Sequence, residues 1–161
     1  MSRFLIIAHR TALTRELQSK VRALAAGDPE AEFAILVPED PDQNYTWEGE
    51  TVDIAQRRAE AARELLVQTT GARIVRAAVG VEDPLKAIAD EIGAHAGYDA
   101  LVICTLPLGI SRWLGQDLVH QAARKFGLPV AHVVADPNRH ERERAEPDHR
   151  AEELWRGRTG R

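Results

Sequence analysis

Five short apolar runs, separated by longer amphipathic stretches, constrain the fold of this chain more than any other feature. Each run is rich in Val, Ile and Leu, and most are continuous, as expected for strands that are covered on both faces. The run at 72–79 alternates in part, because Arg76 interrupts it, and this predicts a position nearer a sheet edge. The five predicted strands are residues 4–8, 33–37, 72–79, 100–104 and 129–134.

Helical periodicity fills the segments between these runs. A first helix with Thr11 or Thr14 as its cap is stopped by Gly27-Asp28-Pro29, and a second spans roughly 52–69 before Gly71. Asp83-Pro84 is a helix start, with an N-cap carboxylate followed by proline, and Gly127 ends the fourth helix. The apolar stripes are Leu13, Leu17, Val21 and Leu24; Ala55, Ala59, Ala62 and Leu66; Leu85, Ile88, Ala89 and Ile92; Leu114, Leu118, Ala122 and Phe126.

The order βαβαβαβαβ predicts a three-layer, doubly wound α/β domain with a five-stranded parallel sheet and helices on both faces. In such a sheet ligands bind beyond the carboxyl ends of the strands, where the strand order reverses. Residues 1–136 form this predicted domain. Residues 137–161 are nearly all charged or small, and we expect a flexible or loosely helical tail.

Composition narrows the functional class. The chain has 161 residues, enough for one domain with a core, and a formal net charge of −4. Its acidic balance disfavours a nucleic-acid binder, because affinity for the phosphate backbone depends on cationic side chains. Cys104 is the single cysteine, which excludes an internal disulfide framework and suits a reducing cytoplasm. The apolar run at the N-terminus is too short for a signal sequence or a membrane span, so a cytoplasmic protein is expected.

Three stretches together resemble the universal stress protein family: FLIIAH, DPLKAIADEIGAHAGYDALVI and SRWLGQDLVHQAARKFGLPVAHVV. The resemblance covers about Ser2 to Asp136. It implies a sheet in the order 3-2-1-4-5 and a homodimer, commonly paired through the last strand, here Pro129–Val134. Members that bind ATP carry Gly-x-x-Gly, nine further residues, then Gly followed by Ser or Thr.

This chain departs from that ATP-binding pattern. Cys104 and Pro107 stand at the first two glycine positions, and Asp117-Leu118 follow the nine-residue spacer. His9 and Arg10 stand where the family usually has an acidic residue after the first strand. Pro107 removes a backbone N–H donor, and Asp117 would repel a triphosphate, so a tight ATP site is disfavoured.

Other residues of the same segment retain the chemistry of an anion site. Gly109 allows positive φ, Ser111 can cap a helix, and Arg112 can pair with an oxyanion. Arg10 is expected across the crevice at the end of the first strand, and Thr105 could touch a ribose or only cap its strand. The candidate ligand-binding residues are Arg10, Thr105, Gly109, Ser111 and Arg112. The alternative is purely structural, with Ser111 an ordinary N-cap and Arg112 a solvated residue.

The remaining reactive residues form no recognisable motif. His9 could serve as a base, contact an adenine, or be a hydrogen-bonded histidine at the rim. Cys104 ends a buried strand, where most cysteines are inert packing residues. His132 lies in the final predicted strand and could be at a dimer edge. No spacing typical of a metal site, nucleotide loop or nucleophile elbow occurs in the sequence.

The sequence therefore favours a non-catalytic regulatory or binding domain that holds a nucleotide or small anion between the first and fourth strands. The cofactor that the resemblance implies is ATP or another adenine nucleotide. One alternative is a dimeric protein-interaction module with no ligand. The other is a weak nucleotide hydrolase, because catalytic sites assemble in space and absent motifs do not exclude an enzyme.

Overall fold

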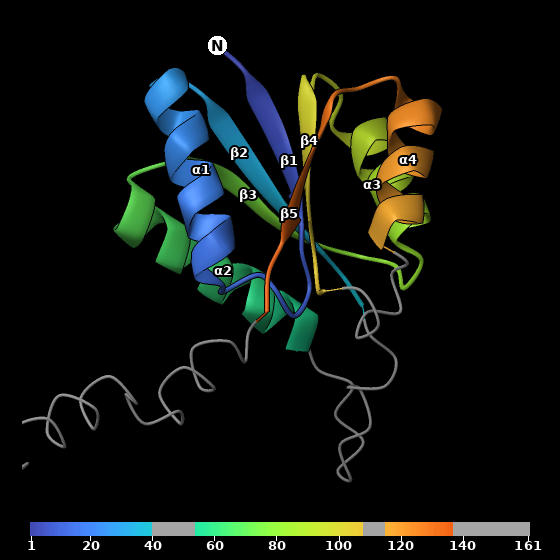
Figure 1. Ribbon diagram of the computed structural model, residues 1–161, viewed down its shortest axis with the longest axis horizontal. Helices are drawn as coiled ribbons and strands as arrows, with labels where there is room; N and C mark the ends of the chain where they lie inside the picture. The colour runs from blue at the N-terminus through green and yellow to red at the C-terminus, as the bar shows by residue number, and fades with distance from the viewer. Residues whose placement is uncertain (40–53, 108–114, 137–161) are drawn as a thin grey trace, which may run out of the picture.

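The computed structural model describes residues 1–39, 54–107 and 115–136. Figure 1 shows strands and helices alternating along these parts of the chain. The elements are β1 (Arg3–Ile7), α1 (Arg15–Gly27), β2 (Glu32–Pro38), α2 (Ile54–Thr70), β3 (Arg73–Gly80), α3 (Pro84–Ala94), β4 (Ala100–Thr105), α4 (Gly115–Phe126) and β5 (Val130–Val134).

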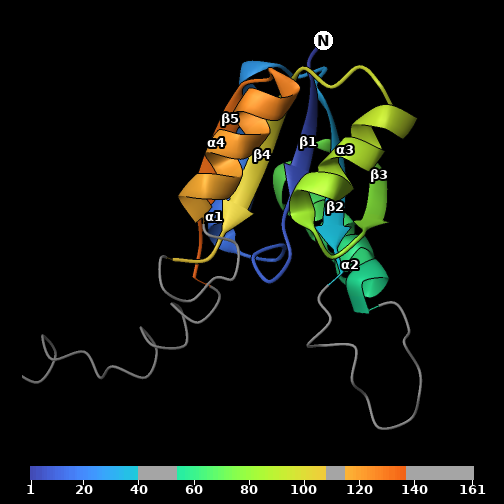
Figure 2. The same cartoon turned by 90° about the vertical axis from the view of Figure 1, so that its right-hand side faces the viewer.

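The five strands form one parallel sheet in the order β3-β2-β1-β4-β5, as predicted. Helices α1 and α2 cover one face of the sheet, and α3 and α4 cover the other (Figures 1 and 2). The interrupted third run is an edge strand, which confirms the expectation from its pattern. The strand order reverses at β1, which pairs with β2 on one side and with β4 on the other.

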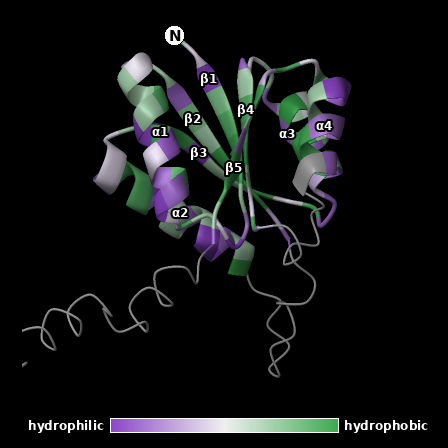
Figure 3. Ribbon diagram, viewed as in Figure 1, coloured by the Kyte–Doolittle hydropathy of each residue, from purple (hydrophilic) through white to green (hydrophobic). Residues whose placement is uncertain are grey.

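The core lies on both faces of β1, and this explains why its sequence is continuously apolar. Leu5 and Ile7 belong to the hydrophobic cluster beneath α3 and α4. Ile6 and Ala8 belong to the cluster beneath α1 and α2. Figure 3 accordingly shows the central strands mostly in green, the colour of hydrophobic residues.

The capping and glycine signals in the sequence predict most of the observed helix boundaries correctly. The Asp83 carboxylate accepts a hydrogen bond of 3.0 Å from the Leu85 N–H, with Pro84 as the first helical residue. Gly71 and Gly127 follow α2 and α4 with φ of 67° and 62°, which favours glycine. Leu13 does not belong to the α1 stripe, because α1 begins at Arg15 and the Leu13 side chain is 47% exposed.

A buried carboxylate on α3 is a feature that the apolar stripe did not predict. Glu91 accepts from Arg76 of β3 at 2.8 Å and 3.3 Å, and from the Tyr98 hydroxyl at 3.0 Å. Burial and the neighbouring Glu91 raise the pKa of Tyr98 to about 12. The charge of Glu91 is therefore compensated at the point where α3 packs on the sheet edge.

Gly80, the last residue of β3, lets α3 approach the sheet closely. A Cβ at this position would lie 2.5 Å from Ala87 Cβ and 3.2 Å from Leu36 Cδ1. We predict that Gly80→Ala lowers the free energy of unfolding by about 1–3 kcal/mol, the usual cost of overpacking. Urea denaturation measures the change.

Gly93, exposed on α3, is the matched control, because a Cβ there meets no atom within 4 Å. Gly93→Ala should be neutral or stabilise the protein by up to about 1 kcal/mol through helix propensity. Equal unfolding free energies for Gly80→Ala and the wild type would contradict the proposed close contact.

Candidate functional site

The candidate site lies at the carboxyl ends of β1 and β4, where the strand order reverses. The loop after β1, residues 8–14, crosses to β4, and the Thr11 hydroxyl donates to the Cys104 carbonyl at 3.0 Å. The Thr14 hydroxyl donates in turn to the Thr11 carbonyl at 2.7 Å. Both threonine side chains are buried, so this loop is anchored at the junction of the two strands.

Two of the five predicted ligand residues lie in the described part of the chain. Arg10 is exposed in the anchored loop, and Thr105 is the last residue of β4. The crossing loop brings them to the same edge of the sheet. Gly109, Ser111 and Arg112 lie outside the described residues.

The Thr105 side chain is 2% exposed, and its hydroxyl lies 2.7 Å from Nε2 of His132 on β5. Partial burial lowers the pKa of His132, which favours its neutral form. A neutral Nε2 without a proton accepts from the Thr105 hydroxyl, which links the end of β4 to the edge strand.

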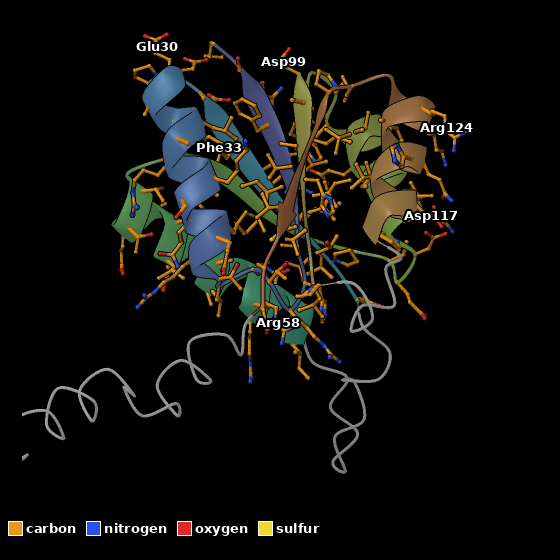
Figure 4. The ribbon with its side chains drawn as sticks, in the orientation of Figure 1. Glu30, Phe33, Arg58, Asp99, Asp117 and Arg124 are labelled. Atoms are coloured by element: carbon orange, nitrogen blue, oxygen red, sulfur yellow. The ribbon has the colours of Figure 1, made fainter. Side chains whose placement is uncertain are left out.

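An unpredicted arginine completes this edge from the opposite side. Arg58 of α2 places its NH1 atom 3.0 Å from Nδ1 and 3.3 Å from Nε2 of His9, which directly follows β1. His9 is 8% exposed and Arg58 is half-buried. The first turns of α2 lie at the carboxyl edge of the sheet, and Figure 4 shows Arg58 there. The two residues are 49 positions apart, so no local pattern could have paired them.

The resulting edge carries guanidinium and imidazole groups close to the reversal of strand order. Guanidinium groups recognise phosphate and carboxylate oxygens through paired donors. Asp117, which the sequence suggested would repel a triphosphate, is exposed on the outer side of α4 and points away from the sheet (Figure 4). Guanidinium and imidazole groups in this arrangement have the chemistry to bind an anion.

Cys104 is poorly suited to nucleophilic chemistry. Its side chain is buried, and this burial raises the pKa of the thiol to about 11, so the thiol is protonated near neutral pH. The described residues contain no group of three or more His, Cys, Asp or Glu side chains placed to hold a metal ion. Among the same residues, no helix combines the length and apolarity needed to cross a bilayer.

Fold and site together define a doubly wound α/β domain with His9, Arg10 and Arg58 at the carboxyl edge of its sheet. No protein-family model matches the sequence. The curated proteins contain no significant match to it either. Among solved structures, a universal stress protein in complex with cAMP is similar, with a TM-score of 0.46 and 17% sequence identity. The similarity covers 84% of this chain and 97% of that chain.

We predict that Cys104 resists alkylation in the folded protein. Iodoacetamide at mildly alkaline pH should leave the native thiol unmodified, because the thiol is both buried and protonated. The same protein in denaturant should be labelled at once, and mass spectrometry distinguishes the two states. Rapid, complete labelling of the native protein would show that Cys104 is accessible and reactive.

Proposed function

We propose that this chain is a universal-stress-protein-like binding domain that holds a nucleotide or another small anion at the carboxyl edge between β1 and β4. One observation carries the proposal: the bond from Thr11 to the Cys104 carbonyl draws the loop after β1 onto the end of β4. Arg10, which precedes Thr11 and is exposed, is thereby held beside the reversal point, where doubly wound sheets bind ligands.

The other ligand contacts in this proposal come from the segment between β4 and α4. In this proposal Gly109, Ser111 and Arg112 contribute to the contacts, and Arg112 pairs with the oxygens of the anion. Pro107 and the absent glycine pattern favour a geometry other than the phosphate cradle of the ATP-binding relatives.

We propose binding without turnover. The thiol of Cys104 has a raised pKa, which disfavours it as a nucleophile. His9, the nearest candidate base, faces the guanidinium of Arg58, and a ring nitrogen that accepts from Arg58 cannot at the same time take a proton from a substrate. These two features favour a regulatory or sensing role over hydrolysis.

Calorimetric titration with ATP, ADP, AMP and cAMP tests the proposal. We expect saturable binding of at least one of them, and Arg10→Ala should weaken it roughly 10- to 100-fold, because a charge-assisted hydrogen bond contributes roughly 1.5–3 kcal/mol. Arg124→Ala is the matched control, since Arg124 lies in the last turn of α4, far from the candidate edge (Figure 4). Absence of heat with every nucleotide would refute nucleotide binding at this edge.

We also propose that the protein is a homodimer paired through β5. The two edge strands of the sheet differ in character. β3 carries Arg73 and Arg76, and its pairing with β2 has a register shift, two features that discourage edge pairing. β5, with the sequence VAHVV, has no charged residue, and Val134 is 52% exposed. An uncharged edge of this kind favours pairing with a second copy.

Sedimentation of two edge variants tests this dimer. Val134→Lys should convert the dimer to monomers, because a lysine at the paired edge would be desolvated against its counterpart. Val75→Lys, at a 43% exposed position of β3, should leave the dimer intact. A monomeric wild-type protein, or dissociation caused by Val75→Lys instead, would contradict pairing through β5.

A further inference from the structure

The edge strand β5 has a histidine at its centre. Along β5, Val130 packs against the hydrophobic cluster beneath α3 and α4, whereas Ala131 and Val133 pack against the cluster beneath α1 and α2. Side chains alternate between the two faces of a strand, so His132 and Val134 lie on the same face as Val130. Both are exposed, and His132 is the middle residue of the strand. An imidazole therefore lies at the centre of the uncharged edge that we propose to pair with a second copy.

The contacts of His132 favour its neutral form. Its Nε2 atom lies 2.7 Å from the hydroxyl of Thr105, whose side chain is 2% exposed. Desolvation lowers the pKa of His132. A protonated ring carries N–H groups on both nitrogens, so the Thr105 hydroxyl could no longer donate to Nε2 and would have to accept instead. The surroundings at the end of β4 therefore oppose the uptake of a proton by His132.

The elements packed against β5 are β4, α1 and α4, and they leave His132 without an opposing charge among the described residues. The neighbour from β4 is the uncharged Thr105, and α1 covers the opposite face of the sheet. Asp136 lies beyond the carboxyl end of β5. The titratable side chains of α4 are all exposed, and Figure 4 shows the first and third of them pointing away from the sheet: Asp117, His120, Arg124 and Lys125.

Two-fold pairing of β5 would bring the two copies of this imidazole close together. A two-fold axis perpendicular to the sheet makes the paired strands antiparallel and keeps like faces on the same side. A residue of the α4 face then lies opposite residues of that face only, because a shift by one position would reverse the faces. In every register that pairs three or more residues of β5, His132 consequently lies opposite Val130, His132 or Val134 of the partner subunit.

The separation of the two imidazoles follows from these registers. Directly opposite residues of an antiparallel pair have Cβ atoms about 4.5–5.5 Å apart, and diagonal neighbours lie about 7–8 Å apart. His132 of one subunit is a direct or a diagonal neighbour of His132 of the partner subunit in each of these registers. Like charges at such separations destabilise the pairing of two strands. Neutral imidazoles carry no such penalty.

We propose that the β5 dimer is a pH-sensitive assembly, in which the two His132 side chains lie close together across the two-fold axis and separate the subunits when both become protonated. The inference rests on the proposed function, since it names a regulation of the dimer proposed there. The dimer binds fewer protons than two separate subunits, so it is stable above the pKa of His132 and weakens as the pH falls through that pKa. Because the pKa of His132 lies below its ordinary value of 6.5, the dimer dissociates in mildly acidic solution.

Sedimentation of the full-length protein at about pH 7.5 and about pH 5.5 tests the proposal. We expect the dissociation constant of the wild-type dimer to rise roughly tenfold or more between these two values. In His132→Gln it should change by less than about twofold, because the amide oxygen can still accept from Thr105 but does not titrate. His95→Gln is the matched control, since His95 is exposed at the end of α3, and this variant should keep the pH dependence of the wild type.

The outcomes separate this inference from the proposed dimer. A wild-type dimer of equal strength at both pH values, or a dimer that dissociates equally in the wild type and in His132→Gln, would overturn the role of His132 and leave the dimer in place. A wild-type protein that is monomeric at both pH values would overturn both proposals.

If His132→Gln does not dimerise at either pH, NMR of the His132 ring in the wild-type protein decides the question. The ring is titrated in a dilute monomeric sample and in a concentrated dimeric one. Because dimerisation and proton binding affect each other reciprocally, we expect a lower titration midpoint in the concentrated sample. Equal midpoints in the two samples would overturn the proposal.

Discussion

The burial of β1 on both faces is the constraint on which the rest of the structure depends. Its side chains alternate between two hydrophobic clusters, one beneath each helical layer, and it pairs with a strand on each side. Ile6, for example, is in register with Ile35 of β2 and with Val102 of β4. Each fully buried aliphatic side chain of this kind contributes about 1.5–3 kcal/mol. The segment of β1 from Phe4 to Ile7 is entirely apolar, and polar side chains follow only beyond its carboxyl end.

The position of the candidate site is a consequence of that arrangement. Helix α1, which follows β1, lies on one face of the sheet, and helix α4, which follows β4 along the chain, lies on the other. Divergent chains leave backbone and side-chain groups exposed between them, which is why the reversal point binds ligands in folds of this class. Here the bond from Thr11 to Cys104 joins the two strand ends. His9 and Arg10 directly follow β1 at this junction, and Arg58 reaches it from α2.

Prediction from sequence succeeded where the physical signal was local. Continuous apolar runs identified the strands, the interrupted run identified an edge, and glycine or aspartate at the ends identified most helix boundaries. Sequence patterns did not reveal the environment of residues whose contacts lie far away in the sequence. Glu91 lies outside the predicted apolar stripe of α3, yet it is buried, and Arg76 and Tyr98 satisfy its oxygens. Leu13 fitted the helical spacing, but the loop anchored by Thr11 delays the start of α1 to Arg15.

The sequence by itself determined the alternation of strands and helices and the parallel sheet, because hydrophobic periodicity and helix-end signals act over a few residues. The resemblance to a family supplied the strand order. Only the tertiary structure decided which side chains meet at the carboxyl edge of the sheet: Arg58 with His9, and Thr105 with His132. These pairs are 49 and 27 residues apart, and their contacts depend on how each helix and strand packs against the sheet. That packing is set by the shapes of many core residues together, and no short stretch of sequence encodes it.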